Sequence, residues 1–127
     1  MIDHVSIGVR DLAGAVKFYE TVLAPLGHAK LVERSSTVGF GKTYPEFWLN
    51  ERPTMAAIAA DSGSHICLRA PSREAVDAFH AAAVRAGGSS DGAPGLRPDY
   101  SPHYYAAFIR DPEGNRIEAV TFVTAAT

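Results

Sequence analysis

The sequence predicts an α+β fold made of two similar modules, each with a sheet and one helix on one side of it. Three identities recur at a spacing of 61 residues: His4 and His65, Phe18 and Phe79, and Gly27 and Gly88. In both copies the histidine opens an alternating apolar run, the phenylalanine lies in a helical pattern, and the glycine closes that pattern. Matching elements at one fixed spacing are typical of an internal structural repeat.

The length of the chain, 127 residues, suits one domain. We expect a single domain over residues 1–127, with module one at 1–50, a connector at 51–63 and module two at 64–123. In each module the predicted order is a strand, a helix and then about three strands.

Module one begins with a predicted strand over residues 2–9. Alternation places Val5, Ile7 and Val9 on one face. His4 and Ser6 then lie on the opposite face. Further short strands are predicted near 29–33, 37–41 and 46–49.

A helix follows this first strand. Asp11 is a suitable N-cap because its carboxylate can accept hydrogen bonds from the free amides of the first turn. Apolar residues then recur at three- and four-residue steps, at Leu12, Val16, Tyr19, Leu23 and Leu26. Pro25 and Gly27 are expected to end the helix.

Module two repeats this order. A strand over 65–69 places His65, Cys67 and Arg69 on one face, and Ser72 is the expected cap of the next helix. The Gly/Pro/Ser-rich segment 89–102 is predicted to be a long loop that acts as a lid or a binding loop. Strands are predicted over 104–110 and 116–122, joined by a turn at 111–115.

Composition excludes several classes of protein. The chain has 12 Lys and Arg against 14 Asp and Glu and no basic run, so we expect no nucleic-acid partner. No stretch approaches the roughly 18–20 apolar residues that a membrane-spanning helix needs. The start of the chain lacks the pattern of a secretory signal. Cys67 is the only cysteine, which rules out an intrachain disulfide and favours a cytoplasmic location.

Three residues are candidate ligands of one divalent metal ion. His4 and His65 occupy equivalent positions in the repeat, on the face opposite the aliphatic residues. Glu118 faces the same way in the last strand, because Ile117 and Ala119 belong to the helix side. Two imidazoles and one carboxylate on a common face suit a divalent cation and leave positions open for water or substrate.

The segments 3–12, 18–19, 64–68 and 111–118 resemble the vicinal oxygen chelate superfamily, which includes glyoxalase I, extradiol dioxygenases, fosfomycin-resistance thiol transferases and bleomycin-binding proteins. The resemblance implies paired βαβββ modules whose curled mixed sheets form a partly open cavity with the helices outside. It also implies a bound metal, often a homodimer, and His4, His65 and Glu118 as the metal ligands. The expected cofactor is one Zn, Ni, Fe, Mn or Co ion.

Two departures from that superfamily concern the chemistry. Glyoxalase I members carry a fourth ligand, a glutamate, on the last strand of module one, where the best alignment here places Trp48. Glu46 shares the face of Trp48, one pleat away. The extradiol dioxygenase pattern has a tyrosine three residues before the Asp-Pro of the turn, where this chain has Phe108.

Further residues are candidates for catalysis and substrate binding. Tyr105 and His103 are the catalytic candidates, as a hydroxyl donor and a general base. Alternation places Tyr104 and Tyr105 on opposite faces without showing which face turns inward. For each of these residues a packing role is the alternative.

The expected substrate-binding residues have four different chemistries. Arg69 presents a planar fork for a carboxylate, Trp48 offers an aromatic wall, and the Tyr104 hydroxyl can donate to a substrate oxygen. Cys67 lies two residues from a predicted ligand, either as a small packing residue or as part of the site.

Together these residues favour a divalent-metal-dependent enzyme that acts on a small oxygen-chelating substrate. The chemistry expected is that of a lyase or isomerase resembling lactoylglutathione lyase, or that of a dioxygenase if the metal is Fe(II). The alternative is a non-catalytic protein of the bleomycin-resistance type, in which Trp48 and the tyrosines stack on a planar ligand.

Overall fold

The computed structural model describes residues 1–124 and consists of two four-stranded sheets and two long helices. Module one contains β1 (Val5–Val9), α1 (Leu12–Leu23), β2 (Ala29–Glu33), β3 (Thr37–Gly41) and β4 (Pro45–Glu51). Module two contains β5 (Ile66–Arg69), α2 (Arg73–Arg85), β6 (Ser89–Leu96), β7 (Tyr104–Arg110) and β8 (Arg116–Phe122). A short 3-10 turn, Ala24–Leu26, follows α1.

The two sheets have the same topology, which confirms the predicted fold class. Their strand orders are β1-β4-β3-β2 and β5-β8-β7-β6, and neither sheet closes on itself. The first strand of each module runs parallel to the last, and the other pairs are antiparallel. His4 and His65 each lie one residue before their strand, so the repeat in the sequence is a repeat in space.

Both helices begin at the predicted caps. Asp11 Oδ1 accepts a hydrogen bond from the Gly14 amide at 3.0 Å, and Ser72 Oγ accepts one from the Ala75 amide at 3.1 Å. Gly27 ends the segment after α1 with φ of 84°, a left-handed conformation that glycine adopts without strain. The local signals at the helix ends are therefore sufficient to define them.

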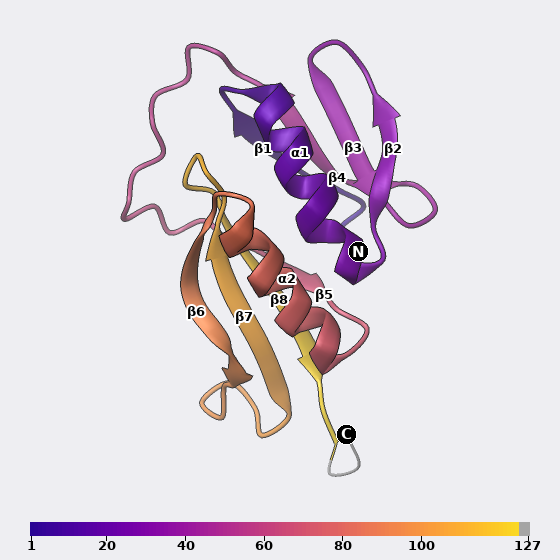
Figure 1. The fold of residues 1–127 in the computed structure, drawn as a ribbon, viewed down its shortest axis with the longest axis vertical. Helices are drawn as coiled ribbons and strands as arrows, with labels where there is room; N and C mark the ends of the chain where they lie inside the picture. The colour runs from indigo at the N-terminus through magenta and orange to yellow at the C-terminus, as the bar shows by residue number, and fades with distance from the viewer. Residues whose placement is uncertain (125–127) are drawn as a thin grey trace.

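The two helices lie side by side on the same side of the two sheets (Figure 1). Apolar residues of both helices and both sheets form one buried cluster, with the aromatic rings of Tyr19, Phe40, Phe47 and Phe79 fully buried. Burial of this apolar surface is the main force that holds the modules together. We call the sheet faces opposite the helices the open faces.

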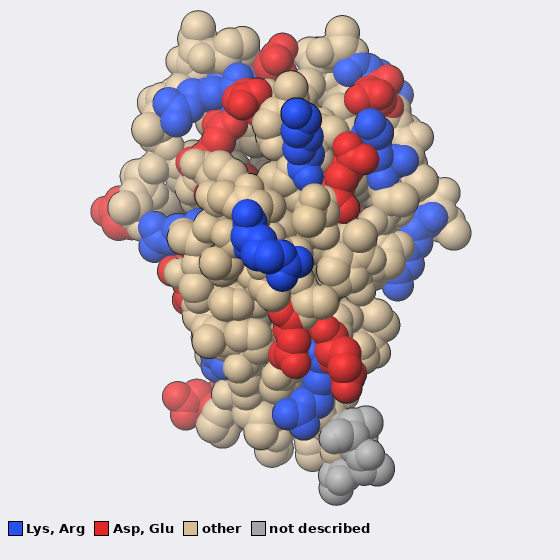
Figure 2. All heavy atoms as spheres, in the orientation of Figure 1, with Lys and Arg blue, Asp and Glu red and all other residues tan. Residues whose placement is uncertain are grey.

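Charged side chains of both signs are interspersed on the helix side of the molecule, without a continuous basic patch on the face that Figure 2 shows. Among the described residues, no helix is long and apolar enough to cross a membrane.

The predicted loop at 89–102 is wrong in its first half, because Ser89–Leu96 forms strand β6 along the edge of sheet two. Its pairing with β7 shifts register twice, between Ser90 and Gly92 and between Gly92 and Gly95. Bulges let an edge strand accommodate glycine and proline, which do not favour regular pairing. A Gly/Pro-rich composition therefore concealed a strand.

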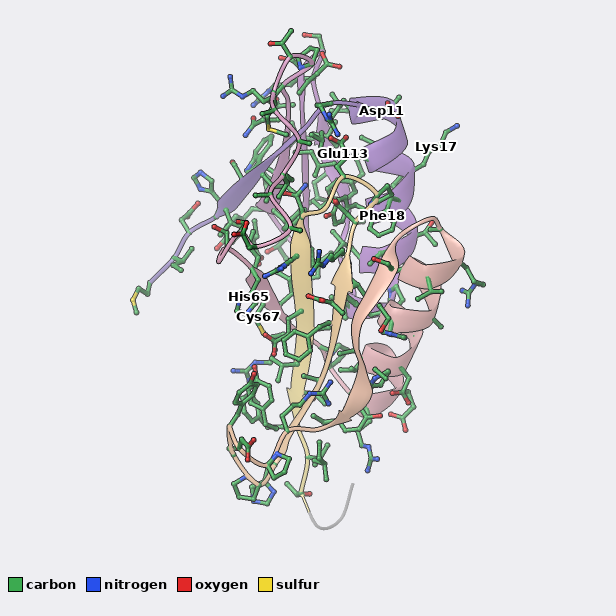
Figure 3. The ribbon with its side chains drawn as sticks, turned by 90° about the vertical axis from the view of Figure 1, so that its left-hand side faces the viewer. Asp11, Lys17, Phe18, His65, Cys67 and Glu113 are labelled. Carbon is green, nitrogen blue, oxygen red and sulfur yellow. The ribbon has the colours of Figure 1, made fainter. Side chains whose placement is uncertain are left out.

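The turn at 111–115 connects module two to module one. Asp111 is buried, and its Oδ2 accepts a hydrogen bond from the Tyr19 hydroxyl of α1 at 2.7 Å. The carboxylate of Glu113 accepts from the amides of Arg10 and Asp11 at 2.6 and 2.9 Å, and the Asn115 side chain donates to the Gly8 carbonyl at 3.3 Å. Figure 3 shows Glu113 beside Asp11. Module two thus supplies an acidic group to the start of α1, whose own first turn has none.

We expect the Glu113→Ala variant to lose about 1–2 kcal/mol of stability, because two amide donors at the start of α1 lose their acceptor. Urea unfolding measures the loss. The control is Glu20→Ala on the exposed side of α1, where Glu20 Oε1 lies 3.7 Å from Lys30 Nζ. The stability of this variant is expected to stay within about 0.5 kcal/mol of that of the unmodified chain. Equal stabilities of the two variants would contradict the role of Glu113.

We expect His28 to make the folding stability sensitive to acid. Its Nδ1 is buried without a hydrogen-bond partner among the described residues, and burial lowers the pKa of its imidazole, while Glu46 and Lys42 act on it in opposite directions. Because the folded pKa lies below the unfolded value, near 6.5, this contribution to stability is complete above about pH 6.5 and decreases as the pH falls below it. The urea midpoint of unfolding is measured at about pH 7.5 and at about pH 5.5. The difference between these two midpoints should be smaller for His28→Leu than for the unmodified chain. An identical pH dependence would contradict this expectation.

Candidate functional site

A carboxylate, an imidazole and a phenol meet on the open face of module two. His65 Nε2 lies 3.1 Å from Glu118 Oε1, and the Tyr104 hydroxyl donates to Glu118 Oε2 at 2.5 Å. Glu118 is only 2% exposed, and in the sheet it lies between Cys67 of β5 and Phe108 of β7. Figure 3 shows His65 and Cys67 on the side of the ribbon away from both helices. A buried carboxylate is costly unless it is paired, and both oxygens of Glu118 have partners.

The protonation states of the neighbours follow from burial and from this carboxylate. Burial and the hydrogen bond to Glu118 raise the pKa of the Tyr104 hydroxyl, which therefore remains a donor. Burial of the thiol, followed by the charge of Glu118, raises the pKa of Cys67 to about 12. Its Sγ lies 3.9 Å from the Tyr104 oxygen. Cys67 is therefore a protonated thiol near neutral pH and a poor nucleophile.

The spacing of His65 and Glu118 suits two ligands of one divalent ion. Ligand atoms about 2.1 Å from a metal and roughly 90–110° apart lie about 3.0–3.4 Å from each other. The 3.1 Å between His65 Nε2 and Glu118 Oε1 lies in that range, and the two atoms are the nitrogen and oxygen donors that such ions take. The residues present therefore fit a divalent metal as a pair.

His4 does not lie with this pair in the single chain. It is exposed on module one, where its Nδ1 lies 2.7 Å from Asp3 Oδ1 and its side chain lines a pocket of about 460 Å³ together with Trp48 and Arg34. Over residues 1–124 no group of three His, Cys, Asp or Glu side chains is arranged to hold a metal. One chain thus brings together two of the three predicted ligands.

Trp48 occupies the position in module one that Glu118 occupies in module two. Ser6 pairs with Trp48 between β1 and β4, and Cys67, the repeat equivalent of Ser6, pairs with Glu118 between β5 and β8. The indole lies across Gly39, where a Cβ atom would be 3.0 Å from its Cη2 and Cζ3 atoms. Module one therefore holds an aromatic ring where module two holds a carboxylate.

The structure separates the two adjacent tyrosines. Tyr105 faces α2, where its hydroxyl donates to Asp77 Oδ1 at 2.6 Å and the Arg73 guanidinium lies over its ring at 4.6 Å. Tyr105 therefore lies on the opposite face of sheet two from Glu118, and the tyrosine that contacts Glu118 is Tyr104. The side-chain direction that alternation left undecided is set by packing against α2.

The other two predicted residues lie on module two. His103 is exposed in the turn before β7, where its amide donates to Ser101 Oγ and its carbonyl accepts from Val123; no hydrogen bond joins its ring to Glu118 within residues 1–124. Arg69 is exposed and lies 5.0 Å from the centre of the Phe122 ring.

Sequence reasoning missed two arginines at the open faces. Arg34 lies over Trp48 at 5.3 Å, and Arg97 lies over Phe108 at 5.3 Å. Both are in turns beside strands, where alternation assigns no face. No sequence signal of the kind used above singles them out.

Two modules of the same topology, with their helices on one side and a histidine–carboxylate pair on an open face, define a class of protein. Comparison with known proteins identifies this class. The model of the Glyoxalase/Bleomycin resistance protein/Dioxygenase superfamily matches residues 1–119. The chain belongs to this superfamily. No curated protein sequence matches the chain.

Solved structures agree with this assignment. A glyoxalase/bleomycin resistance protein from Albidiferax ferrireducens T118 is 34% identical, with 93% of this chain and 95% of that chain covered and a TM-score of 0.80. A glyoxalase/bleomycin resistance protein/dioxygenase family enzyme from Burkholderia phytofirmans PsJN is 20% identical, with coverages of 96% and 98% and a TM-score of 0.73. The V278E glyoxalase I mutant from Zea mays is 20% identical, with coverages of 92% and 44% and a TM-score of 0.72. The last two show the fold alone.

Proposed function

We propose that this protein is a divalent-metal-dependent enzyme of the glyoxalase/dioxygenase type that acts on a small oxygen-chelating substrate. The observation that carries the proposal is the buried Glu118 carboxylate held 3.1 Å from His65 Nε2 on an open sheet face. Paired titratable groups on an open face are common at functional sites. When bound, the metal would act as a Lewis acid toward two substrate oxygens.

The third ligand in this proposal is His4 of a second copy of the chain. His4 lies on the open face of module one, and His65 and Glu118 lie on the open face of module two. In a twofold dimer, module one of each copy can pack against module two of the other copy. Each of these two equivalent contacts would bring His4 of one copy to His65 and Glu118 of the other, which creates two equal sites. The proposed enzyme is therefore a homodimer, and its cytoplasmic location stays a prediction.

The chain's own residues have defined tasks in this proposal. His65 and Glu118 bind the metal, and Tyr104 holds Glu118 through a hydroxyl that remains protonated because of its raised pKa. Tyr104 is thus a positioning residue, whereas Cys67 contributes an uncharged wall. Trp48 occupies the place of a fourth protein ligand, which leaves that coordination position to water or substrate.

Trp48 also favours a second candidate function, a ligand-sequestering protein of the bleomycin-resistance type. The indole together with Tyr44 lines the pocket on module one, a lining that suits a planar ligand. A sequestering protein has no need of a buried Glu118 carboxylate paired with the exposed His65 imidazole, and for this reason the enzyme is the primary proposal.

Metal content and turnover separate the two functions. The protein is purified without chelators, its metal is counted by mass spectrometry, and the loaded protein is assayed with a hemithioacetal and with a catechol. The enzyme proposal predicts about one ion per chain and turnover of one substrate. Absence of bound metal, or a metal that leaves both substrates unchanged, would favour the sequestering function.

A further inference from the structure

We propose that the pocket on the open face of module one binds a carboxylate of the substrate through Arg34, whose guanidinium is held in place by Trp48. The pocket measures about 460 Å³ and is lined by Arg34, Trp48, Tyr44 and His4, among others. This inference deepens the proposed function and rests on it for its meaning in catalysis. The binding event itself depends only on residues of module one.

Arg34 has donors available for a ligand. Its Cζ lies 5.3 Å from the centre of the Trp48 ring, and no Asp or Glu oxygen among the described residues lies within 4 Å of its nitrogens. Arg110 and Arg116, by contrast, are both paired with Asp91. A guanidinium offers a planar fork that matches a carboxylate with two parallel hydrogen bonds. Arg34, positioned by the Trp48 ring and without an acidic partner, can therefore donate hydrogen bonds to a bound anion.

The position of Trp48 is fixed by the sheet beneath it. Gly39 of β3 is its cross-strand neighbour, and the absence of a side chain there leaves room for the indole to lie across the strand. Pro45 closes the same space, with its Cβ 2.8 Å from where a Gly39 Cβ would lie. A rigid ring reduces the entropy that Arg34 loses when it binds a ligand.

The charges in the pocket leave Arg34 as the anchor for an anion. The one carboxylate in the lining is Asp3, and it is engaged with His4 at 2.7 Å. His4 is the proposed third metal ligand, so a carboxylate bound to Arg34 would belong to the same substrate as the oxygens bound to the metal. Arg34 then selects substrates that carry a negative charge beyond their chelating oxygens.

Module two shows the same combination independently. Arg69 lies over Phe122 at 5.0 Å, and Arg97 lies over Phe108 at 5.3 Å with a hydrogen bond to the Ala93 carbonyl at 2.7 Å. Phe108 is itself 6.4 Å from the His65 ring. Guanidinium groups on aromatic rings thus border the open faces of both modules. The substrate class inferred is a small planar organic acid.

The chain provides its own probe, because Trp48 is the only tryptophan. Benzoate is titrated into the protein in EDTA, and the fluorescence of Trp48 and the heat of binding are recorded. We expect a saturable fluorescence change with benzoate and at least about tenfold weaker binding of benzamide, which has the ring without the charge. Inorganic phosphate, the other common ligand of arginine, is expected to bind more weakly than benzoate.

Two variants complete the test. Arg34→Gln should weaken benzoate binding by about tenfold or more in calorimetry, whereas Arg85→Gln in the exposed last turn of α2 should bind as the unmodified chain does. Equal affinities of Arg34→Gln and Arg85→Gln, equal binding of benzamide and benzoate, or tighter binding of phosphate would overturn the inference. Because EDTA removes any metal, a failure here is distinct from a failure of the proposed metal site.

Discussion

Replacing Glu118 by glutamine is expected to lower bound divalent metal from about one ion per chain to less than about a tenth of that. The amide keeps the shape of the side chain and can still accept the hydrogen bond from Tyr104, but it lacks the negative charge that a divalent ion requires. Turnover of any substrate is expected to fall with the metal. Mass spectrometry of the purified variant measures the metal, and a substrate assay measures turnover.

Two features of Glu118→Gln make the result interpretable. Because the change removes a buried charge and keeps the volume, the folded state is expected to be as stable as before, which thermal unfolding verifies. The matched control is Glu46→Gln. Glu46 is the carboxylate that shares the strand face of Trp48, and the proposed site does not use it as a ligand. This control is expected to keep its metal. Full metal content in Glu118→Gln would contradict the proposed site.

Replacing Asp111 by alanine is expected to cost about 3–4 kcal/mol of folding stability. The buried carboxylate accepts hydrogen bonds from the Tyr19 hydroxyl, from the amides of Glu113 and Asn115, and from the Asn115 side chain, at 2.7–2.9 Å. Alanine leaves the buried Tyr19 hydroxyl and the partly buried donors of Glu113 and Asn115 without this acceptor, and it loosens the turn that connects the modules. Urea unfolding with a single transition measures the loss.

The companion variant is Tyr19→Phe, which removes one donor and keeps the ring in the core. Its expected cost is about 1–2 kcal/mol, because Asp111 keeps its other three partners. Burial and the neighbouring Asp111 carboxylate raise the pKa of Tyr19, so its hydroxyl is a donor at every pH at which the protein is tested. If Asp111→Ala cost no more than Tyr19→Phe, the account of the turn as a connection between modules would be contradicted.

The elements that the sequence predicted correctly are those governed by local rules. Alternation along the two predicted first strands oriented His4 and His65, although β1 begins at Val5 and not at residue 2. Asp11 and Ser72 begin the helices because their side chains accept from amides three residues on. Strand β6 was missed because bulges at Gly92 and Gly95 allow a glycine- and proline-containing segment to pair. The local composition of residues 89–96 does not show that β7 lies beside this segment and can pair with it.

The site was less predictable than the fold, for a physical reason. The contact of His65 with Glu118 follows from the parallel pairing of β5 with β8, and alternation along these strands predicted that both side chains share a face. The face of sheet two on which Tyr104 lies depends on which residues α2 buries. Alternation places Tyr104 and Tyr105 on opposite faces but does not show which of the two faces α2. The distance of His4 from the pair depends on how two modules, or two copies, are placed, and no local pattern carries that information.

A mixing experiment tests the central claim, a metal site shared between two copies of the chain. His4→Ala and Glu118→Gln are purified separately, shown to lack metal, unfolded, mixed in equal amounts, refolded together and supplied with the metal. In a mixed dimer one site keeps His4 from one chain and His65 with Glu118 from the other, and the second site loses two ligands. Since half of the dimers are mixed, we expect metal to return to about a quarter of the unmodified content. No recovery after mixing would contradict the shared site.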